Sequence, residues 1–184
     1  PVYLRPGGAF GGSCLPKDVR ALQHIATASG SNLPVIDSLL RSNDAHKHRM
    51  FEYATEGLAP GARVLLVGLA FKAGTDDLRE SPNVDLARKL LAAGFQVLTA
   101  PNGVEALRLL DQHPDIKLVL MDISMPEMDG FPLTTKIREK YTKTELAVIG
   151  ISSEGKNLLA ARFIKNGAND FIVKQSFLTE EFYS

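Results

Sequence analysis

The sequence of 184 residues is poor in cysteine, lacks tryptophan and carries no net charge. The one cysteine, Cys14, cannot form a disulfide within the chain and is typical of a reducing compartment, so we expect a cytoplasmic protein. No apolar run approaches the length of a membrane span. The 21 basic residues equal the 21 acidic residues and form no basic stripe, so neither nucleic acid nor an anionic membrane is expected as a partner.

Two helices are predicted in residues 1–60, after a loop rich in glycine and proline. Apolar side chains recur with helical spacing over residues 18–29, and Gly30 can end that helix. This apolar face consists of Val19, Leu22, Ile25 and Ala26. Residues 34–58 predict a longer helix with an apolar stripe that needs a covering surface. The stripe consists of Val35, Ile36, Leu39, Leu40, Met50, Phe51 and Ala54.

From residue 61 onward the pattern changes to short apolar runs that alternate with helical segments. This alternation predicts an α/β fold with a five-stranded parallel sheet in the order 2-1-3-4-5, in which chemistry takes place at the carboxyl ends of the strands. The expected strands are 63–69, 95–99, 116–121, 146–151 and 170–173, and the expected helices are 82–93, 102–112, 131–140 and 156–166. Residues 178–184 supply only about two turns of a further helix. We therefore expect the helices of residues 18–58 to cover one sheet face, from the same chain or from a second copy.

Four segments of the second half carry a family resemblance: VLTAPNGVEALRLL, LVLMDISMPEMDG, LAVIGISSEG and GANDFIVKQ. Over residues 95–184 they resemble a response-regulator receiver domain, which has a flavodoxin-like fold. The resemblance implies that Asp122 accepts a phosphoryl group from a histidine kinase or another phosphodonor. It implies further roles for Ser152 as the hydroxyl switch residue, Phe171 as the aromatic switch residue and Lys174 as the phosphate-binding residue. Gln175 departs from the family pattern, which usually has proline after the lysine.

The same resemblance implies a Mg²⁺ ion, bound by the Asp122 carboxylate, the backbone carbonyl of Ser124 and an acidic pair after the first strand. That pair is missing, because Gly68 and Leu69 stand in its place. The nearest substitutes are Asp76 and above all Asp77, in the loop beyond the strand. Since Mg²⁺ prefers several oxygen ligands, we expect weak Mg²⁺ binding, if any, and feeble phosphorylation. Restoring the pair with Gly68→Asp and Leu69→Asp is expected to raise Mg²⁺ affinity.

The first half resembles a different family, the nucleotide-sugar (GDP-mannose and UDP-glucose) 6-dehydrogenases. The segments are YLRPGGAFGGSCLPKDVRAL, SNLPVIDSLLRSNDAHKHRMF and RVLLVGLAFKAGTDDLRESPNVDLARKLLAAGFQV. The resemblance implies that Cys14 is the nucleophile, with Lys17 and Asp18 beside it. It implies that helix 34–58 forms a homodimer. It also implies nucleotide-sugar contacts from Arg5, Lys72 and Arg79.

From the residues alone, Cys14 is either an activated thiol before a helix, with Lys17 nearby, or a small buried apolar side chain. Lys72 and Arg79 could simply be solvated charges on a loop and on the first helical turn. No G-x-G-x-x-G motif follows any expected strand, so NAD is not expected to bind. Without a hydride acceptor, the dehydrogenase reaction is not expected and Cys14 would be idle.

We interpret the chain as a chimera of the two families, engineered or formed by gene shuffling. Residues 1–60 form the helical segment and residues 61–184 the hybrid α/β domain, with a dehydrogenase-like unit up to about residue 97. The residues 84–100 suit both families, so the seam lies within them. Three hypotheses remain open: a weakly active receiver, a dehydrogenase remnant that binds a nucleotide sugar without turnover, or a structural chimera with no native activity.

Overall fold

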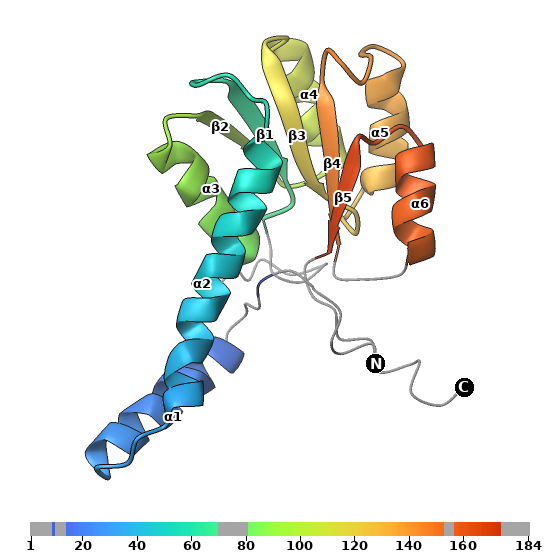
Figure 1. Cartoon of the computed structure of the whole chain (residues 1–184). Coiled ribbons are helices and arrows are strands. Elements are labelled where there is room, and N and C mark those ends of the chain that lie inside the picture. Colours follow the sequence, from blue (N-terminus) through green and yellow to red (C-terminus); the bar gives the residue numbers. More distant parts are fainter. Residues whose placement is uncertain (1–8, 10–13, 70–80, 153–156, 174–184) are drawn as a thin grey trace.

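The computed structural model describes residues 9, 14–69, 81–152 and 157–173. The fold contains a five-stranded sheet with helices on both faces, and a pair of helices of which one end extends away from the sheet (Figure 1). No helix within these ranges is both long enough and apolar enough to span a membrane.

The first two helices agree with the predicted segments but have shifted ends. Helix α1 runs Leu15–Ala28 and starts before residue 18, because Pro16 is well suited to the first helical turn. Gly30, with φ of 68°, follows its end, and Ser31 N donates to Ala26 O at 2.9 Å, as in a Schellman turn. Helix α2 runs Pro34–Thr55, also with proline in its first turn.

The sheet confirms the predicted fold class, with all strands parallel and in the order β2-β1-β3-β4-β5. The strands are β1 (Arg63–Val67), β2 (Gln96–Ala100), β3 (Ile116–Asp122), β4 (Ala147–Ser152) and β5 (Asp170–Val173). The helices between them are α3 (Pro82–Ala92), α4 (Gly103–Gln112), α5 (Gly130–Arg138) and α6 (Asn157–Lys165). Each predicted helix and strand between residues 15 and 173 therefore exists, with bounds that differ by up to three residues. The helix expected in residues 178–184 lies outside the described residues.

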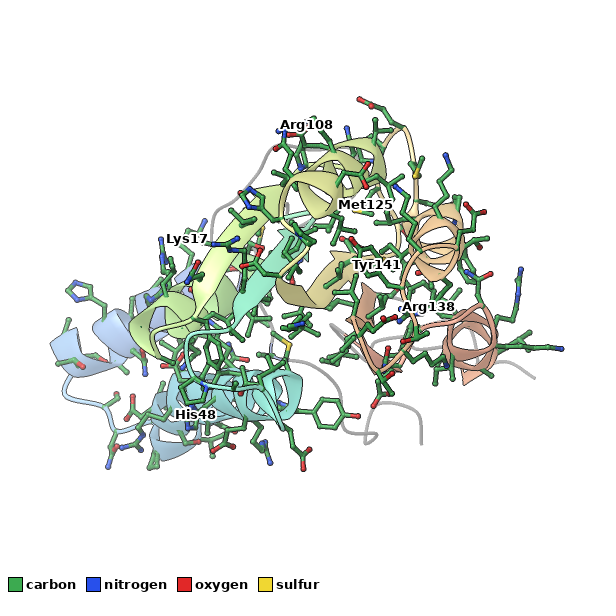
Figure 2. The ribbon with its side chains drawn as sticks, turned by 90° about the horizontal axis from the view of Figure 1, so that it is seen from above. Lys17, His48, Arg108, Met125, Arg138 and Tyr141 are labelled. Atoms are coloured by element: carbon green, nitrogen blue, oxygen red, sulfur yellow. The ribbon has the colours of Figure 1, made fainter. Side chains whose placement is uncertain are left out.

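Each sheet face is buried against its own set of helices. One face, called the α4–α6 face, packs on helices α4, α5 and α6. The other, called the α2–α3 face, packs on helices α2 and α3. Successive residues of β1 alternate between them: Leu65 and Val67 contribute to the α4–α6 face, and Val64 and Leu66 to the α2–α3 face. In the view from above, α2 with His48 lies on one side of the sheet and α4 with Arg108 on the other (Figure 2).

A bulge in β3 sets which of its side chains face which helices. Arg63 of β1 pairs with Ile116, whereas Val64 pairs with Leu118, so Lys117 is an extra residue in β3. As a result Ile116 packs on the α4–α6 face although Leu118, two residues later, packs on the α2–α3 face. From Leu118 to Asp122 the register is then regular.

The last turns of α2 cover the sheet within the same chain. Met50 and Ala54 are buried in the same apolar cluster as Leu118, Leu120, Ile149 and Ile151 of the sheet. Two polar contacts fix the helix: Lys47 Nζ lies 2.5 Å from the Asp85 carboxylate on α3, and the Tyr53 hydroxyl donates to Asp170 on β5. Of the two arrangements expected for the apolar stripe, this part folds back on the sheet.

The first part of α2 and all of α1 lie beside each other, away from the sheet (Figure 1). The predicted α1 face is only half right: Val19 and Ala26 are buried, but Leu22 and Ile25 are exposed. Val35 on α2 is also exposed. Within the described part of the chain α1 packs mainly on α2, so it buries a narrower stripe than its apolar pattern predicts.

Candidate functional site

Asp122 is the last residue of β3, a strand with neighbours on both sides. It pairs in register with Ile151 of β4 and is 7% exposed. The backbone N–H of Ser124 donates to Asp122 Oδ1 at 3.2 Å, which orients the carboxylate. The carboxylate therefore stands at the carboxyl edge of the sheet, where parallel α/β folds place their chemistry.

The backbone of the loop after Asp122 is held by hydrogen bonds to the starts of α4 and α5. Gly130 N donates to Ile123 O at 2.8 Å, and Gly103 N donates to Met128 O at 3.3 Å. A Cβ atom at Gly103 would lie 2.8 Å from Met128 Cγ, so the loop requires glycine at the start of α4. Asp129 caps α5, with its Oδ1 accepting from Phe131 N at 3.0 Å. In Figure 2 Met125, from this loop, lies between α4 and α5.

Two of the predicted switch residues lie on neighbouring strands of the same sheet. Ser152 ends β4, one residue beyond the partner of Asp122, and is buried. Phe171 on β5 pairs with Gly150 and packs into the α4–α6 face, with its ring centroid 6.3 Å from that of Phe163. A Cβ atom at Gly150 would lie 2.4 Å from the Phe163 ring, so this packing requires glycine. Lys174 and Gln175 lie outside the described residues.

The two positions expected to carry the acidic pair, Gly68 and Leu69, follow directly after β1, and their backbone carbonyls accept hydrogen bonds from side chains at the start of α3. Gly68 has a φ of 77°, and a Cβ atom there would lie 2.9 Å from Asp122 Cβ. Asn83 Nδ2 donates to Gly68 O at 2.8 Å, and Ser81 Oγ donates to Leu69 O at 2.7 Å. The end of β1 thus presents no carboxylate to Asp122, and its two carbonyl oxygens already accept hydrogen bonds.

These described residues do not fit the metal site that the receiver resemblance implies. Within residues 14–69, 81–152 and 157–173, no group of three or more His, Cys, Asp or Glu side chains is placed to hold a metal ion. Asp76 and Asp77 lie outside the described ranges. Gly68 allows no side chain without displacement of Asp122 or Met125. The sequence expectation that Gly68→Asp and Leu69→Asp would restore Mg²⁺ binding is therefore at odds with the backbone geometry.

The residues of the dehydrogenase resemblance are placed only in part. Cys14 is exposed at the start of α1, and its carbonyl accepts from Asp18 N at 2.9 Å. The exposed Lys17 ammonium lies 3.7 Å from the Asp18 carboxylate and forms an ion pair with it. The interpretation of Cys14 as a buried apolar side chain is wrong. Arg5, Lys72 and Arg79 lie outside the described residues.

Several polar side chains that matter to this structure were not singled out by the sequence patterns. Ser81 and Asn83 are each at most 2% exposed. The sequence Ser81-Pro82 is a recognisable helix start, but it does not reveal that the Ser81 and Asn83 side chains donate hydrogen bonds to the backbone just after β1.

Tyr53 was not singled out either. The hydrogen bond to Asp170, together with burial, raises the pKa of Tyr53 to about 12. That contact joins segments over one hundred residues apart, which no local pattern predicts.

Comparison with protein families finds both resemblances. The response regulator receiver domain model matches residues 79–181, more than half of the chain. The central domain of the UDP-glucose/GDP-mannose dehydrogenase family matches residues 1–45. The receiver match begins within the segment before α3, so it extends further toward the amino terminus than the resemblance over 95–184 indicated.

Similar curated proteins include GDP-mannose 6-dehydrogenase of Pseudomonas putida, 38% identical over 158 residues, which are 86% of this chain and 34% of that protein. The enzyme of the same name from Azotobacter vinelandii is 49% identical over 107 residues, 58% of this chain and 24% of that protein. The chain thus spans about a third or less of the length of these relatives. An alignment of 158 residues necessarily extends into the receiver-like part.

Solved structures of both kinds are also similar. A ternary complex of GDP-mannose dehydrogenase from Pseudomonas aeruginosa has a TM-score of 0.59 and 31% identity, covering 82% of this chain and 38% of that one. A "probable two-component system response regulator/GGDEF domain protein" has a TM-score of 0.52 and 35% identity, covering 74% of this chain and 52% of that one. Both kinds of structure therefore share much of this α/β arrangement.

Proposed function

The chain belongs to the response-regulator receiver family, joined to a dehydrogenase-like segment, and from that premise we propose that it is a weakly active phosphoacceptor domain with Asp122 as acceptor. The observation that supports this most is the position of Asp122. It is a mostly buried carboxylate at the end of β3, oriented by Ser124 N and followed at the next strand end by Ser152.

The proposed chemistry requires little of the protein beyond position and charge. An Asp122 carboxylate oxygen attacks the phosphorus of a phosphodonor, a P–O bond forms, and the bond to the leaving group breaks with its electron pair. The Ser124 N–H fixes the carboxylate for that attack. Ser152 and Lys174 are the proposed contacts of the transferred phosphoryl oxygens, and Phe171 the proposed switch residue. A histidine kinase or a small acyl phosphate is the proposed donor.

The direct test is incubation of the whole chain with acetyl phosphate, with and without Mg²⁺, followed by intact mass spectrometry. We expect a phosphoryl adduct on a minority of chains and none in Asp122→Asn. Asp129→Asn is the matched control, because Asp129 is a nearby carboxylate that caps α5. An adduct of equal yield in Asp122→Asn would overturn the assignment. Complete absence of an adduct would favour a structural chimera with no native activity.

A second candidate function is nucleotide-sugar binding without turnover, favoured by the match of residues 1–45 and the similarity to GDP-mannose 6-dehydrogenases. Arg5, Lys72 and Arg79 are the proposed contacts, with Lys17 and Asp18 beside an idle Cys14. Calorimetry with GDP-mannose tests it: saturable binding lost in Arg79→Ala supports the proposal, and no binding contradicts it. No oxidation is expected when NAD is added, because the chain has no Gly-rich dinucleotide motif.

A homodimer through α2 is the proposed assembly. The first half of α2 and α1 lie away from the sheet and expose Leu22, Ile25 and Val35. A second copy offers the same self-complementary surface. Light scattering should show a dimer at micromolar concentration that Val35→Glu dissociates. A monomer in the unmodified chain would contradict this assembly without affecting the assignment of Asp122.

A further inference from the structure

The proposed receiver function leaves open what occupies the end of β1 in place of the acidic pair. There the chain has two side chains from the start of α3 that bond to consecutive backbone carbonyls. Ser81 Oγ donates to Leu69 O at 2.7 Å and Asn83 Nδ2 donates to Gly68 O at 2.8 Å. We propose that these two residues, the β1 anchor, hold Gly68 against Asp122 and exclude a divalent cation from the carboxylate. This inference rests on the proposed role of Asp122.

The β1 anchor holds Gly68 in a conformation that other residues rarely adopt. With φ of 77°, Gly68 lies in the left-handed region, where a side chain is strained. Its N–H donates to Ala100 O at 2.9 Å while its carbonyl accepts from Asn83, so the peptide groups on both sides of the residue are fixed. Turning the residue to a negative φ would break one of these bonds.

The anchored conformation also brings the Gly68 backbone close to the acceptor. A Cβ atom at residue 68 would lie 2.9 Å from Asp122 Cβ and 3.1 Å from Met125 Sδ. A carboxylate at residue 68 cannot be added without displacing Asp122 or Met125, or changing the backbone. Since Mg²⁺ needs near-octahedral oxygen ligands, carbonyls already bonded to Ser81 and Asn83 are poor substitutes.

The orientation of the Asn83 amide shows which of its atoms the anchor uses. Its Nδ2 donates to Gly68 O, while its Oδ1 is buried and has no hydrogen-bond partner among the described residues. The reverse orientation would set two oxygen acceptors against each other at the Gly68 carbonyl. Aspartate has the shape of asparagine but no N–H donor, so Asn83→Asp removes the bond to Gly68 with little change in volume.

The first test measures the anchor on the unphosphorylated whole chain, without phosphodonor. Amide hydrogen exchange of Gly68 reports opening of the β1 end, because this N–H is bonded to Ala100 O. We expect Asn83→Asp and Ser81→Ala each to speed that exchange by about tenfold, which corresponds to one lost hydrogen bond. Ser38→Ala is the matched control, because Ser38 Oγ donates to Val35 O at 2.7 Å on exposed α2. Wild-type exchange in both β1-anchor variants would overturn the proposal.

The second test measures the cation directly, by following amide NMR shifts near Asp122 during a Mg²⁺ titration. The unmodified chain should show no saturable millimolar binding that Asp122→Asn removes. Gly68→Asp with Leu69→Asp should gain no Mg²⁺ affinity and should lower the Tm. Asp122-dependent Mg²⁺ binding in the unmodified chain would contradict the inference, and loss of that binding in Asp77→Asn would assign the ligand to the following loop. Neither result depends on phosphorylation, so the proposed function and the β1 anchor can fail separately.

Discussion

The two faces of the sheet are closed in different ways. The α4–α6 face is covered by three helices that each connect successive strands, and its core includes the fully buried Phe163 between Phe131 and Phe171. The α2–α3 face is covered partly by a helix that precedes the first strand and is fixed by the Lys47–Asp85 and Tyr53–Asp170 contacts. Apolar burial is non-directional, so a helix of dehydrogenase-like sequence can close a receiver-like sheet. An acidic pair depends on individual residues, and Gly68 and Leu69 stand where the receiver resemblance expects it.

The largest effect on stability should come from truncating a large side chain in the core of the α4–α6 face. Phe163→Ala removes a ring that contacts two other aromatic rings and the Gly150 backbone, so it should lower the free energy of unfolding by about 3–5 kcal/mol. Met50→Ala, on the α2–α3 face, should cost about 2–3 kcal/mol, because Met50 is at the edge of its cluster and is 8% exposed. Urea unfolding measures both. A larger loss for Met50→Ala would reverse the comparison of the two faces.

A smaller effect should come from the ion pair between α2 and α3. The Lys47 side chain is 11% exposed and the Asp85 side chain 22%, so removing Lys47 leaves a poorly solvated carboxylate whose remaining cation is the exposed Arg88, at 3.4 Å. Lys47→Ala should lower the free energy of unfolding by about 1–3 kcal/mol, and a double-mutant cycle with Asp85→Asn should recover part of that loss. His48→Ala, which breaks an exposed pair with Glu52, should cost under about 0.5 kcal/mol. Equal costs for the two pairs would show that the partly buried Lys47–Asp85 pair does not fix α2.

The smallest effect should come from Tyr53→Phe and should depend on pH. The pKa of Tyr53 is raised to about 12 by its hydrogen bond to Asp170, above the usual 10.0. A raised pKa favours the protonated phenol in the folded state, so its contribution is complete below pH 10.0 and is lost as pH rises toward about 12. The stability of the unmodified chain should therefore fall more steeply over that window than that of Tyr53→Phe. Parallel urea midpoints for the two proteins would contradict the Tyr53–Asp170 contact.

The sequence was a good guide to this fold because its signals are local and periodic. Apolar runs and proline or glycine punctuation predicted each helix and strand, and Asp122, Ser152 and Phe171 lie on neighbouring strands as expected. The burial of α1 was less well predicted, because Leu22 and Ile25 have helical spacing but are exposed among the residues that the structure describes. Spacing shows which residues share a face, and it does not show what the face meets.

The sequence predicted the acceptor carboxylate of the candidate site, but it did not predict the backbone geometry around that carboxylate. The absence of acids at Gly68 and Leu69 is visible in the sequence. The positive φ of Gly68 and its hydrogen bond from Asn83 are not, because they join the end of a strand to a helix fifteen residues later. For this reason the proposed repair by Gly68→Asp looked reasonable from sequence and is opposed by the close approach to Asp122.

The most direct measurement of whether α2 belongs to the receiver-like sheet is native-state hydrogen exchange as a function of denaturant. If α2 closes the α2–α3 face in the same chain, the amides of Met50 and Ala54 should exchange through the same global opening as those of Leu118 and Leu120. Amides near Val35, where α2 lies away from the sheet, should exchange faster by local fraying. Exchange of Met50 and Ala54 that is as fast as that near Val35, and independent of denaturant, would contradict the packing described for α2.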